Sequence, residues 1–287
     1  MPLNRDVRTD LASERLEFAR TAAEITELPG VISREEQQNG FRVTSVEILD
    51  ERGSELLCKP IGHYYTVDLE ALIRRQENAF EDAAELLAEL LRSLLSEAMD
   101  GGVLVAGLGN KAITPDAIGP LSVESVMATR HLKEKLPEDF AAFREVSAIA
   151  TGVLGTTGIE SAEVLRAVAK ATSPASIIAV DALASASLDR LCRSVQLSNA
   201  GIVPGSGVGN DRAELSSATF GIPVIAVGVP TVVDAAVFSD MPEAKGMFVT
   251  PRNIDSSVQD CSKLIGYSID LALHDGLTIG DIDMFLS

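Results

Sequence analysis

Four continuous apolar runs are the feature that most constrains how this chain can fold. They are Val103–Leu108, Val146–Ala150, Ser176–Val180 and Ile222–Val229. Uninterrupted apolar strands are typical of a sheet that is covered on both faces. A loop and then a helical pattern follow the runs, and this order predicts parallel strands joined by helical crossovers. We therefore expect an α/β protein, with a central, twisted and mostly parallel sheet in a three-layer α/β/α arrangement.

The first hundred residues carry other patterns. We expect residues 1–30, which are polar, to form an N-terminal arm that adds no core element and could be a propeptide. A small β-meander is expected between residues 41 and 67, with a bulge at Ser45 and a strand at Leu56–Cys58. Residues 68–100 contain neither Gly nor Pro and predict one long amphipathic helix. The rest, residues 31–287, is expected to be a single α/β domain.

Composition limits the classes of partner. The formal net charge is -18 and the sequence pI is about 4.5, which disfavours direct nucleic-acid binding because that surface must neutralise phosphates. The three cysteines lie far apart and are odd in number, so we expect no disulfide framework and a reducing compartment. No apolar stretch approaches the ~20 residues needed to span a bilayer. We expect a cytoplasmic protein without a membrane partner.

Three aspartates each follow one of the expected strands: Asp116, Asp181 and Asp234. Loops after parallel strands gather at one edge of the sheet, so these carboxylates can converge on one crevice. Two carboxylates held close together do not both ionise easily, and they provide an acid and a base around one water molecule. Asp is also common as a cap or turn residue. That alternative explains Asp234 best and Asp116 least, because Asp116 lies between Pro115 and Pro120.

Two glycine-containing loops can aim backbone N–H groups at a ligand. One includes Gly155, Thr156 and Thr157 and is expected to end in a capping box formed by Thr157 and Glu160, where a helix over Ser161–Thr172 begins. The other includes Gly205, Ser206 and Gly207. Either loop can hold an anion or a peptide carbonyl, and either can equally be a tight turn. The three histidines have no zincin spacing, and Gly-x-Gly-x-Gly is a weak nucleotide signal, so we expect neither a metal nor a cofactor.

Several longer motifs resemble the germination protease family of spore-forming bacteria. They extend over nearly the whole chain and include Arg8–Ala12, Gly107–Pro120, Gly155–Glu160, Val180–Ala184, Pro204–Asn210 and Gly228–Ala235. The segment from Asn110 to Asp116 is also similar to hydrogenase maturation proteases, although the later motifs are not. Compared with familiar germination proteases, the chain looks shorter between Asp234 and its last helix.

The resemblance implies an atypical aspartic endopeptidase that degrades small acid-soluble spore proteins during germination. It carries the catalytic carboxylates onto Asp116 and Asp181. It also implies a zymogen that removes its own N-terminal propeptide, a homotetramer, and a location in the spore core. We further expect substrate contacts from the residues around these carboxylates. They are Asn110, Gly155, Thr156, Thr157, Gly205, Ser206, Gly207 and Asp234.

Two alternatives remain open on the sequence alone. In one, the glycine loops cradle an anion or a nucleotide and the protein is a binding module that breaks no bond. In the other, the carboxylates form a metal site, as in a metal-sensing endopeptidase of the hydrogenase maturation type. Stabilisation by nucleotides would favour the first alternative, and inhibition by chelators would favour the second.

Overall fold

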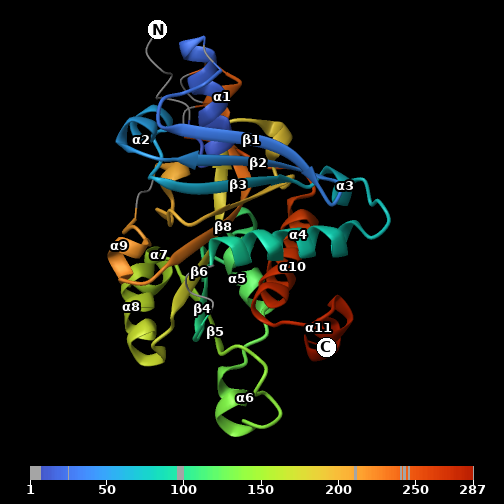
Figure 1. Cartoon of the computed structure of the whole chain (residues 1–287). Helices are drawn as coiled ribbons and strands as arrows, with labels where there is room; N and C mark the ends of the chain where they lie inside the picture. The colour runs from blue at the N-terminus through green and yellow to red at the C-terminus, as the bar shows by residue number, and fades with distance from the viewer. Residues whose placement is uncertain are drawn as a thin grey trace.

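One mixed sheet of nine strands organises the computed structural model (Figure 1). The structure describes residues 8–24, 26–95, 100–209, 212–239, 241, 244 and 246–286. The strand order is β1-β2-β3-β7-β8-β6-β4-β5, and β9 pairs with β8. Parts of three expectations lie outside the described residues. They are Ile25 of the N-terminal arm, residues 96–99 of the long helix expected over 68–100, and Asn210–Asp211 at the end of the second glycine loop.

The centre of the sheet is parallel, as the apolar runs predict. Its four strands are β4 (Val103–Leu108), β5 (Val146–Gly152), β6 (Ser176–Ser185) and β8 (Val224–Asp234). Strand β4 pairs in parallel with both β5 and β6, and β6 pairs in parallel with β8. Strands β4, β6 and β8 are almost entirely buried because helices cover both of their faces, whereas β5, at the edge of the sheet, is mostly half-buried. The expected α/β fold with a parallel core is confirmed.

The meander is continuous with this core, because its last strand pairs with β7. The antiparallel strands are β1 (Val31–Gln38), β2 (Phe41–Ile48), β3 (Gly62–Asp68), β7 (Ser194–Ser198) and β9 (Phe248–Val249). The strand expected at Leu56–Cys58 is wrong. Helix α2 (Glu51–Leu57) occupies this segment, and the Asp50 carboxylate caps it by accepting the N–H of Gly53.

The bulge expected at Ser45 is also wrong. Strand β2 pairs with β3 without a break in register. Phe41 and Val43 pack into the core beside helix α4 (Ala79–Leu94), whereas Val46 and Ile48 pack on the opposite face beside helix α1 (Ala12–Ala23) and α2. The apolar residues therefore switch from odd to even positions along β2 because both faces of the strand are covered, and not because a residue has been inserted.

Helices cover the parallel strands on two sides (Figure 1). One large apolar cluster joins the sheet to α4 (Ala79–Leu94), α5 (Ile118–Glu124) and α10 (Ile254–Leu273), and a second joins the opposite face to α8 (Ser161–Thr172). Helix α8 has the expected bounds, but no side chain caps its N-terminus. The expected Thr157/Glu160 capping box is therefore absent. The remaining helices are α6 (Arg130–Lys135), α7 (Leu154–Thr157), α9 (Ser217–Phe220) and α11 (Ile279–Leu286).

The helix expected over residues 68–100 begins later and is divided. A short helix, α3 (Glu70–Ile73), ends at Arg74, and α4 starts after Asn78. Arg75 and Asn78 both adopt left-handed backbone conformations, with φ of 52° and 58°. Neither position contains Gly or Pro, so no helix-breaking residue in the sequence marks the interruption between the two helices.

The N-terminal segment contributes to the core, contrary to expectation. Helix α1 (Ala12–Ala23) buries Ala12, Leu16 and Ala19 against β2, β3 and α2. The preceding residue, Leu11, is fully buried. Residues 8–23 are therefore held against the sheet by packing.

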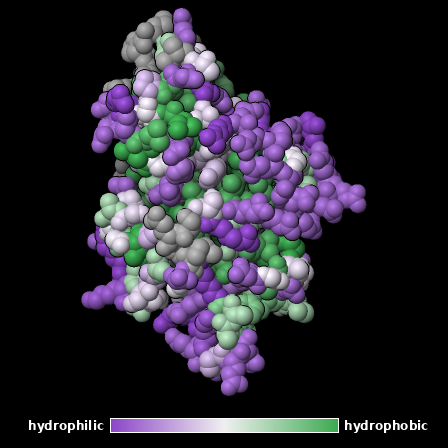
Figure 2. Space-filling view, in the orientation of Figure 1, coloured by the Kyte–Doolittle hydropathy of each residue, from purple (hydrophilic) through white to green (hydrophobic). Residues whose placement is uncertain are grey.

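Hydrophilic side chains cover most of the visible face, including the regions over α3 and α6 (Figure 2). This polar surface agrees with the acidic composition of the chain. None of the helices in the described part of the chain combines the length and hydropathy needed to span a bilayer.

Candidate active site

A cavity of about 570 Å³ lies beside the ends of the parallel strands. Asp116 and Asp181 both line it. Asp116 ends a 3-10 turn (Thr114–Asp116) between β4 and α5, and Asp181 lies within β6. The structure thus brings the two expected catalytic carboxylates to one cavity.

Three glycines bring Asp116 to this position. A Cβ on Gly107 would lie 2.3 Å from the carbonyl oxygen of Gly119, and a Cβ on Gly119 would lie 2.2 Å from that of Leu108. Only glycine at both positions lets the backbones of β4 and α5 approach so closely. Gly109 has a φ of +108°, and a Cβ there would lie 2.1 Å from the carbonyl oxygen of Asp116. The glycines therefore fold the loop back on itself, and Asp116 returns toward the end of β4.

Two hydrogen bonds then hold the loop that carries Asp116. The backbone N–H of Asn110 donates to Oδ2 of Asp116 at 2.8 Å. The buried hydroxyl of Thr231 donates to the carbonyl oxygen of Pro115 at 2.7 Å. Thr231 lies in β8 at a break in the β6 register, where Leu183 faces Pro230 and Ala184 faces Val232. The register shift between β6 and β8 thus coincides with the residue whose hydroxyl binds Pro115.

Asp181 is placed by the sheet itself. The sequence pattern predicts that β6 ends before Asp181, but the strand continues to Ser185 alongside β8. The pairing of β6 with β4 stops at Val180, one residue before Asp181. Asp181 therefore lies just beyond the end of β4 and is only 5% exposed. Its Oδ1 accepts the N–H of Ala182 at 2.9 Å.

Burial shifts the acidity of both carboxyl groups in the same direction. Burial raises the pKa of Asp116 above its usual range, and the N–H of Asn110 opposes this shift. Burial raises the pKa of Asp181 much further, and the nearby charge of Asp116 adds to the shift. Ionisation of both carboxyl groups at once is therefore disfavoured.

A third carboxylate, Asp10, lines the same cavity. Its Oδ1 accepts the hydroxyl of Ser206 at 2.7 Å, and its Oδ2 accepts the N–H of Ala184 at 2.8 Å. Sequence reasoning assigned Asp10 no role, although it belongs to the Arg8–Ala12 motif. It also missed an ion pair between Arg212 and Glu160, which both line the cavity with their charged groups 3.5 Å apart.

The structure brings only some of the expected substrate-binding residues to the cavity. Gly205 and Gly207 line it, and Ser206 faces a neighbouring cavity while donating to Asp10. Asn110 contributes its backbone N–H to Asp116. Gly155, Thr156 and Thr157 belong to α7 and are absent from the lining, where Val153 and Leu154 lie instead. The hydroxyls of Thr156 and Thr157 donate to the carbonyl oxygen of Val153.

Asp234, the third aspartate of the expected crevice, does not line the cavity. It ends β8, and its carboxylate accepts the N–H of Ala236 at 2.9 Å. It also lies 3.5 Å from the guanidinium of Arg8. These contacts are those of a turn-forming residue that also anchors the N-terminal segment.

Metal-ligating side chains do not gather in the described part of the chain. No group of three or more His, Cys, Asp or Glu residues there has the geometry to hold a metal ion.

Comparison with known proteins shows which family this chain belongs to. The model of the germination protease family matches residues 8–241. The germination protease of Caldanaerobacter subterraneus is 40% identical over 98% of both chains, and that of Clostridium tetani is 39% identical over 98% of this chain and 99% of its own. These alignments run over 321 and 324 positions, more than the 287 residues of this chain, so the relatives contain segments that it lacks.

Among solved structures, a NiFe hydrogenase maturation protease from Thermococcus kodakarensis is similar over 63% of this chain and 98% of its own. The TM-score is 0.38 and the sequence identity is 18%, and a likeness of this degree carries no functional argument. The family match, by contrast, spans residues 8–241 of this chain, a range that contains Asp10, Asp116 and Asp181. The chain belongs to the germination protease family and is accordingly a peptidase.

Proposed function

We propose that Asp116 and Asp181 are the catalytic pair of an aspartic-type endopeptidase. The observation that carries this proposal is the convergence of two carboxyl groups on one cavity, where burial raises the pKa of both and the charge of Asp116 raises that of Asp181 further. Carboxyl groups that share one site in this way supply an acid and a base together.

The two environments assign the roles. Asp116 has the smaller upward pKa shift, so it is the base that takes a proton from water. The water oxygen attacks the peptide carbonyl carbon, and Asp181 gives its proton to the carbonyl oxygen. When the intermediate collapses, the C–N bond breaks, the amine takes the proton held by Asp116, and a hydroxyl proton of the intermediate returns to Asp181, so both carboxyl groups regain their starting states. Each positioned acid or base contributes roughly 10²–10⁴-fold to the rate.

The substrate we propose is a small acid-soluble spore protein, degraded in the spore core during germination. Family membership supports a spore protease, and the open cavity beside the sheet is large enough for several side chains of an extended peptide. Replacement of Asp116 or Asp181 by Asn should lower kcat/KM on such a protein by at least about 10²-fold. Circular dichroism should show unchanged folding.

Asp139→Asn is the matched control, because Asp139 is exposed and lies between α6 and β5. It should cleave at the normal rate. Normal cleavage by both Asp116→Asn and Asp181→Asn would remove the pair from the mechanism.

We also propose that the chain is a zymogen whose N-terminal segment blocks the cavity until it is cut. Asp10 lines the cavity. Arg8 forms an ion pair with Asp234. The Glu14 carboxylate accepts hydrogen bonds from the Ser185 hydroxyl and the Ala186 N–H. The same carboxyl pair would then cut this segment in its own chain.

Acidification should trigger this cut. The raised pKa of Asp116 and Asp181 means that the doubly ionised pair formed at high pH is disfavoured, and protonation of one member restores the acid that catalysis requires. Intact-mass measurement during acidification should show loss of N-terminal residues in the unaltered chain and none in Asp181→Asn. A chain that is active while still full length would contradict the zymogen proposal.

A further inference from the structure

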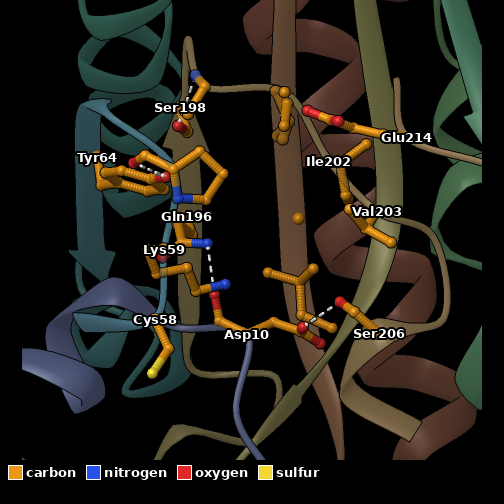
Figure 3. Close-up of a pocket in the computed structure, with 17 residues that line it drawn as sticks. Asp10, Cys58, Lys59, Tyr64, Gln196, Ser198, Ile202, Val203, Ser206 and Glu214 are labelled. Atoms are coloured by element: carbon orange, nitrogen blue, oxygen red, sulfur yellow. Dashed lines mark hydrogen bonds between the residues drawn. The ribbon is translucent and has the colours of Figure 1, made fainter. Parts of the chain in front are cut away.

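A second cavity, of about 260 Å³, adjoins the first. The two share Asp10 and Leu183 in their linings. Figure 3 shows Asp10 between Lys59, which comes from the end of α2, and Ser206, which comes from the glycine loop. Asp10 thus lies at the boundary between the catalytic cavity and a smaller one, where groups from distant parts of the chain surround its carboxylate.

The carboxylate of Asp10 has a closely fitted surrounding. Both of its oxygens accept hydrogen bonds, one from the Ser206 hydroxyl and one from the Ala184 N–H. A Cβ on Gly207 would lie 2.0 Å from Oδ2 of Asp10, so only glycine at that position admits the carboxylate. The residue as a whole is 8% exposed. This arrangement is shaped for an acidic group and gives it donors on two sides.

Lys59 adds a positive charge to the same place. Its side chain extends toward Asp10, whereas Glu214 lies on the opposite wall (Figure 3). Burial lowers the pKa of Lys59, and the charge of Asp10 opposes that shift. Within the described part of the chain, no hydrogen bond or ion pair to its ammonium group is found. An ammonium group in such a setting is stabilised by an anion nearby.

The backbone of the N-terminal segment is held in the manner of a bound peptide. The N–H of Asp10 donates to the carbonyl oxygen of Ala184 at 2.9 Å. The side chain of Gln196 donates to the carbonyl oxygen of Asp10 at 3.0 Å and accepts the N–H of Ala12 at 2.7 Å. Ala184 lies on β6, the strand that also carries Asp181. The segment therefore crosses the same strand that supplies one of the two carboxyl groups.

We propose that Lys59, Ser206 and the N–H of Ala184 form the subsite that recognises an acidic side chain of the peptide substrate. In the full-length chain Asp10 occupies this subsite. The inference rests on the proposed function, because it requires the N-terminal segment to leave and a substrate peptide to take its place.

The first experiment measures substrate discrimination by the processed enzyme. The cut sites in a small acid-soluble spore protein are mapped by mass spectrometry, and a peptide around one site is made with each Glu or Asp changed in turn to Gln or Asn. One change should lower kcat/KM roughly 10-fold or more, because a hydrogen-bonded charge is lost. In Lys59→Met and in Ser206→Ala, the ratio of kcat/KM between the original peptide and the changed peptide should fall toward unity. Lys170→Met, on the exposed face of α8, should keep it.

The outcomes separate the two proposals. If the unaltered enzyme cuts no peptide, the proposed function fails. If it cuts and Lys59→Met discriminates as strongly as before, the subsite is wrong while the peptidase proposal stands.

A second experiment on the full-length chain needs no activity. Asp10→Asn, Lys59→Met and the double variant are compared by thermal unfolding. Because both substitutions remove the same interaction, the double variant should lose less in Tm than the sum of the two single losses. Strict additivity would show that Lys59 does not recognise the carboxylate at this position and would overturn the assignment.

Discussion

Buried titratable residues away from the cavity have pKa shifts with the same main cause as those of Asp116 and Asp181, namely burial. Asp270 on α10 is fully buried, and its Oδ1 accepts the N–H of Met127 at 2.9 Å. Its Oδ2 and the Nε2 of His274 are buried without a hydrogen-bond partner in the described part of the chain. Burial raises the pKa of Asp270 to about 8 and lowers that of His274 to about 4. Both side chains are therefore mainly uncharged at neutral pH, which suits their apolar surroundings.

These shifts predict how stability depends on pH. The folded state binds the Asp270 proton more tightly than the unfolded state, so this residue lowers the free energy of unfolding as the pH rises from about 4 to about 8. His274 acts oppositely between about pH 4 and 6.5, because its pKa is depressed on folding. Asp270→Asn should therefore flatten the stability curve most clearly between pH 6.5 and 8.

The expected change in slope is up to ~1.4 kcal/mol per pH unit. Urea unfolding at a series of pH values measures it. Equal slopes for the variant and the unaltered chain would show that the Asp270 pKa is not raised.

At the scale of elements, the site depends on how closely one helix approaches one strand. Helix α5 contacts β4 through Gly107 and Gly119, where no Cβ can be accommodated. Thr231 in β8 then ties the intervening loop at Pro115. The position of Asp116 is therefore decided by contacts among three elements.

Gly119→Ala tests this dependence. Its Cβ would lie 2.2 to 2.4 Å from three backbone atoms of β4 and β6, so α5 must move away from the sheet. We expect a loss of about 1–3 kcal/mol in unfolding free energy, together with lower kcat at unchanged folding under assay conditions. Gly155→Ala is the matched control, since nothing lies within 4 Å of its Cβ, and it should have little effect on either quantity. Normal stability and kcat in Gly119→Ala would contradict the close-contact argument.

For the whole molecule, we propose assembly into a homotetramer. A run of exposed apolar side chains follows β8, and one of them, Phe248, also lines the cavity that holds Asp116 and Asp181. Exposed apolar groups of this kind mark interaction surfaces in soluble proteins. They are Val237, Phe238, Met241, Met247, Phe248 and Val249.

Light scattering with size-exclusion chromatography tests this assembly. The unaltered chain should have four times the mass of one chain, and Phe238→Asp should shift the distribution toward smaller species, because a charge would be buried at the interface. Leu136→Asp, at an exposed apolar residue next to α6, is the control and should leave the mass unchanged. A monomeric unaltered chain at micromolar concentration would refute the proposal.

The sequence by itself determined the parts of the protein that depend on local periodicity. The four apolar runs predict the parallel strands, and the pattern from Ser161 to Thr172 predicts α8 with its bounds. The glycine- and proline-bounded stretch from Gly107 to Pro120 singled out Asp116. These signals are readable because burial, helix period and backbone restriction act on neighbouring residues.

Only the tertiary structure decided which distant residues meet. Strand β1 is polar because it is an edge strand, so its sequence carries no apolar alternation. Strand β2 alternates irregularly because both its faces are covered. Asp10 reaches the cavity through Ala184 and Ser206, which lie 174 and 196 residues away in the chain. A local pattern records that a residue is buried or restricted, but the group it contacts is set by how the elements pack, and that information lies outside any short stretch of sequence.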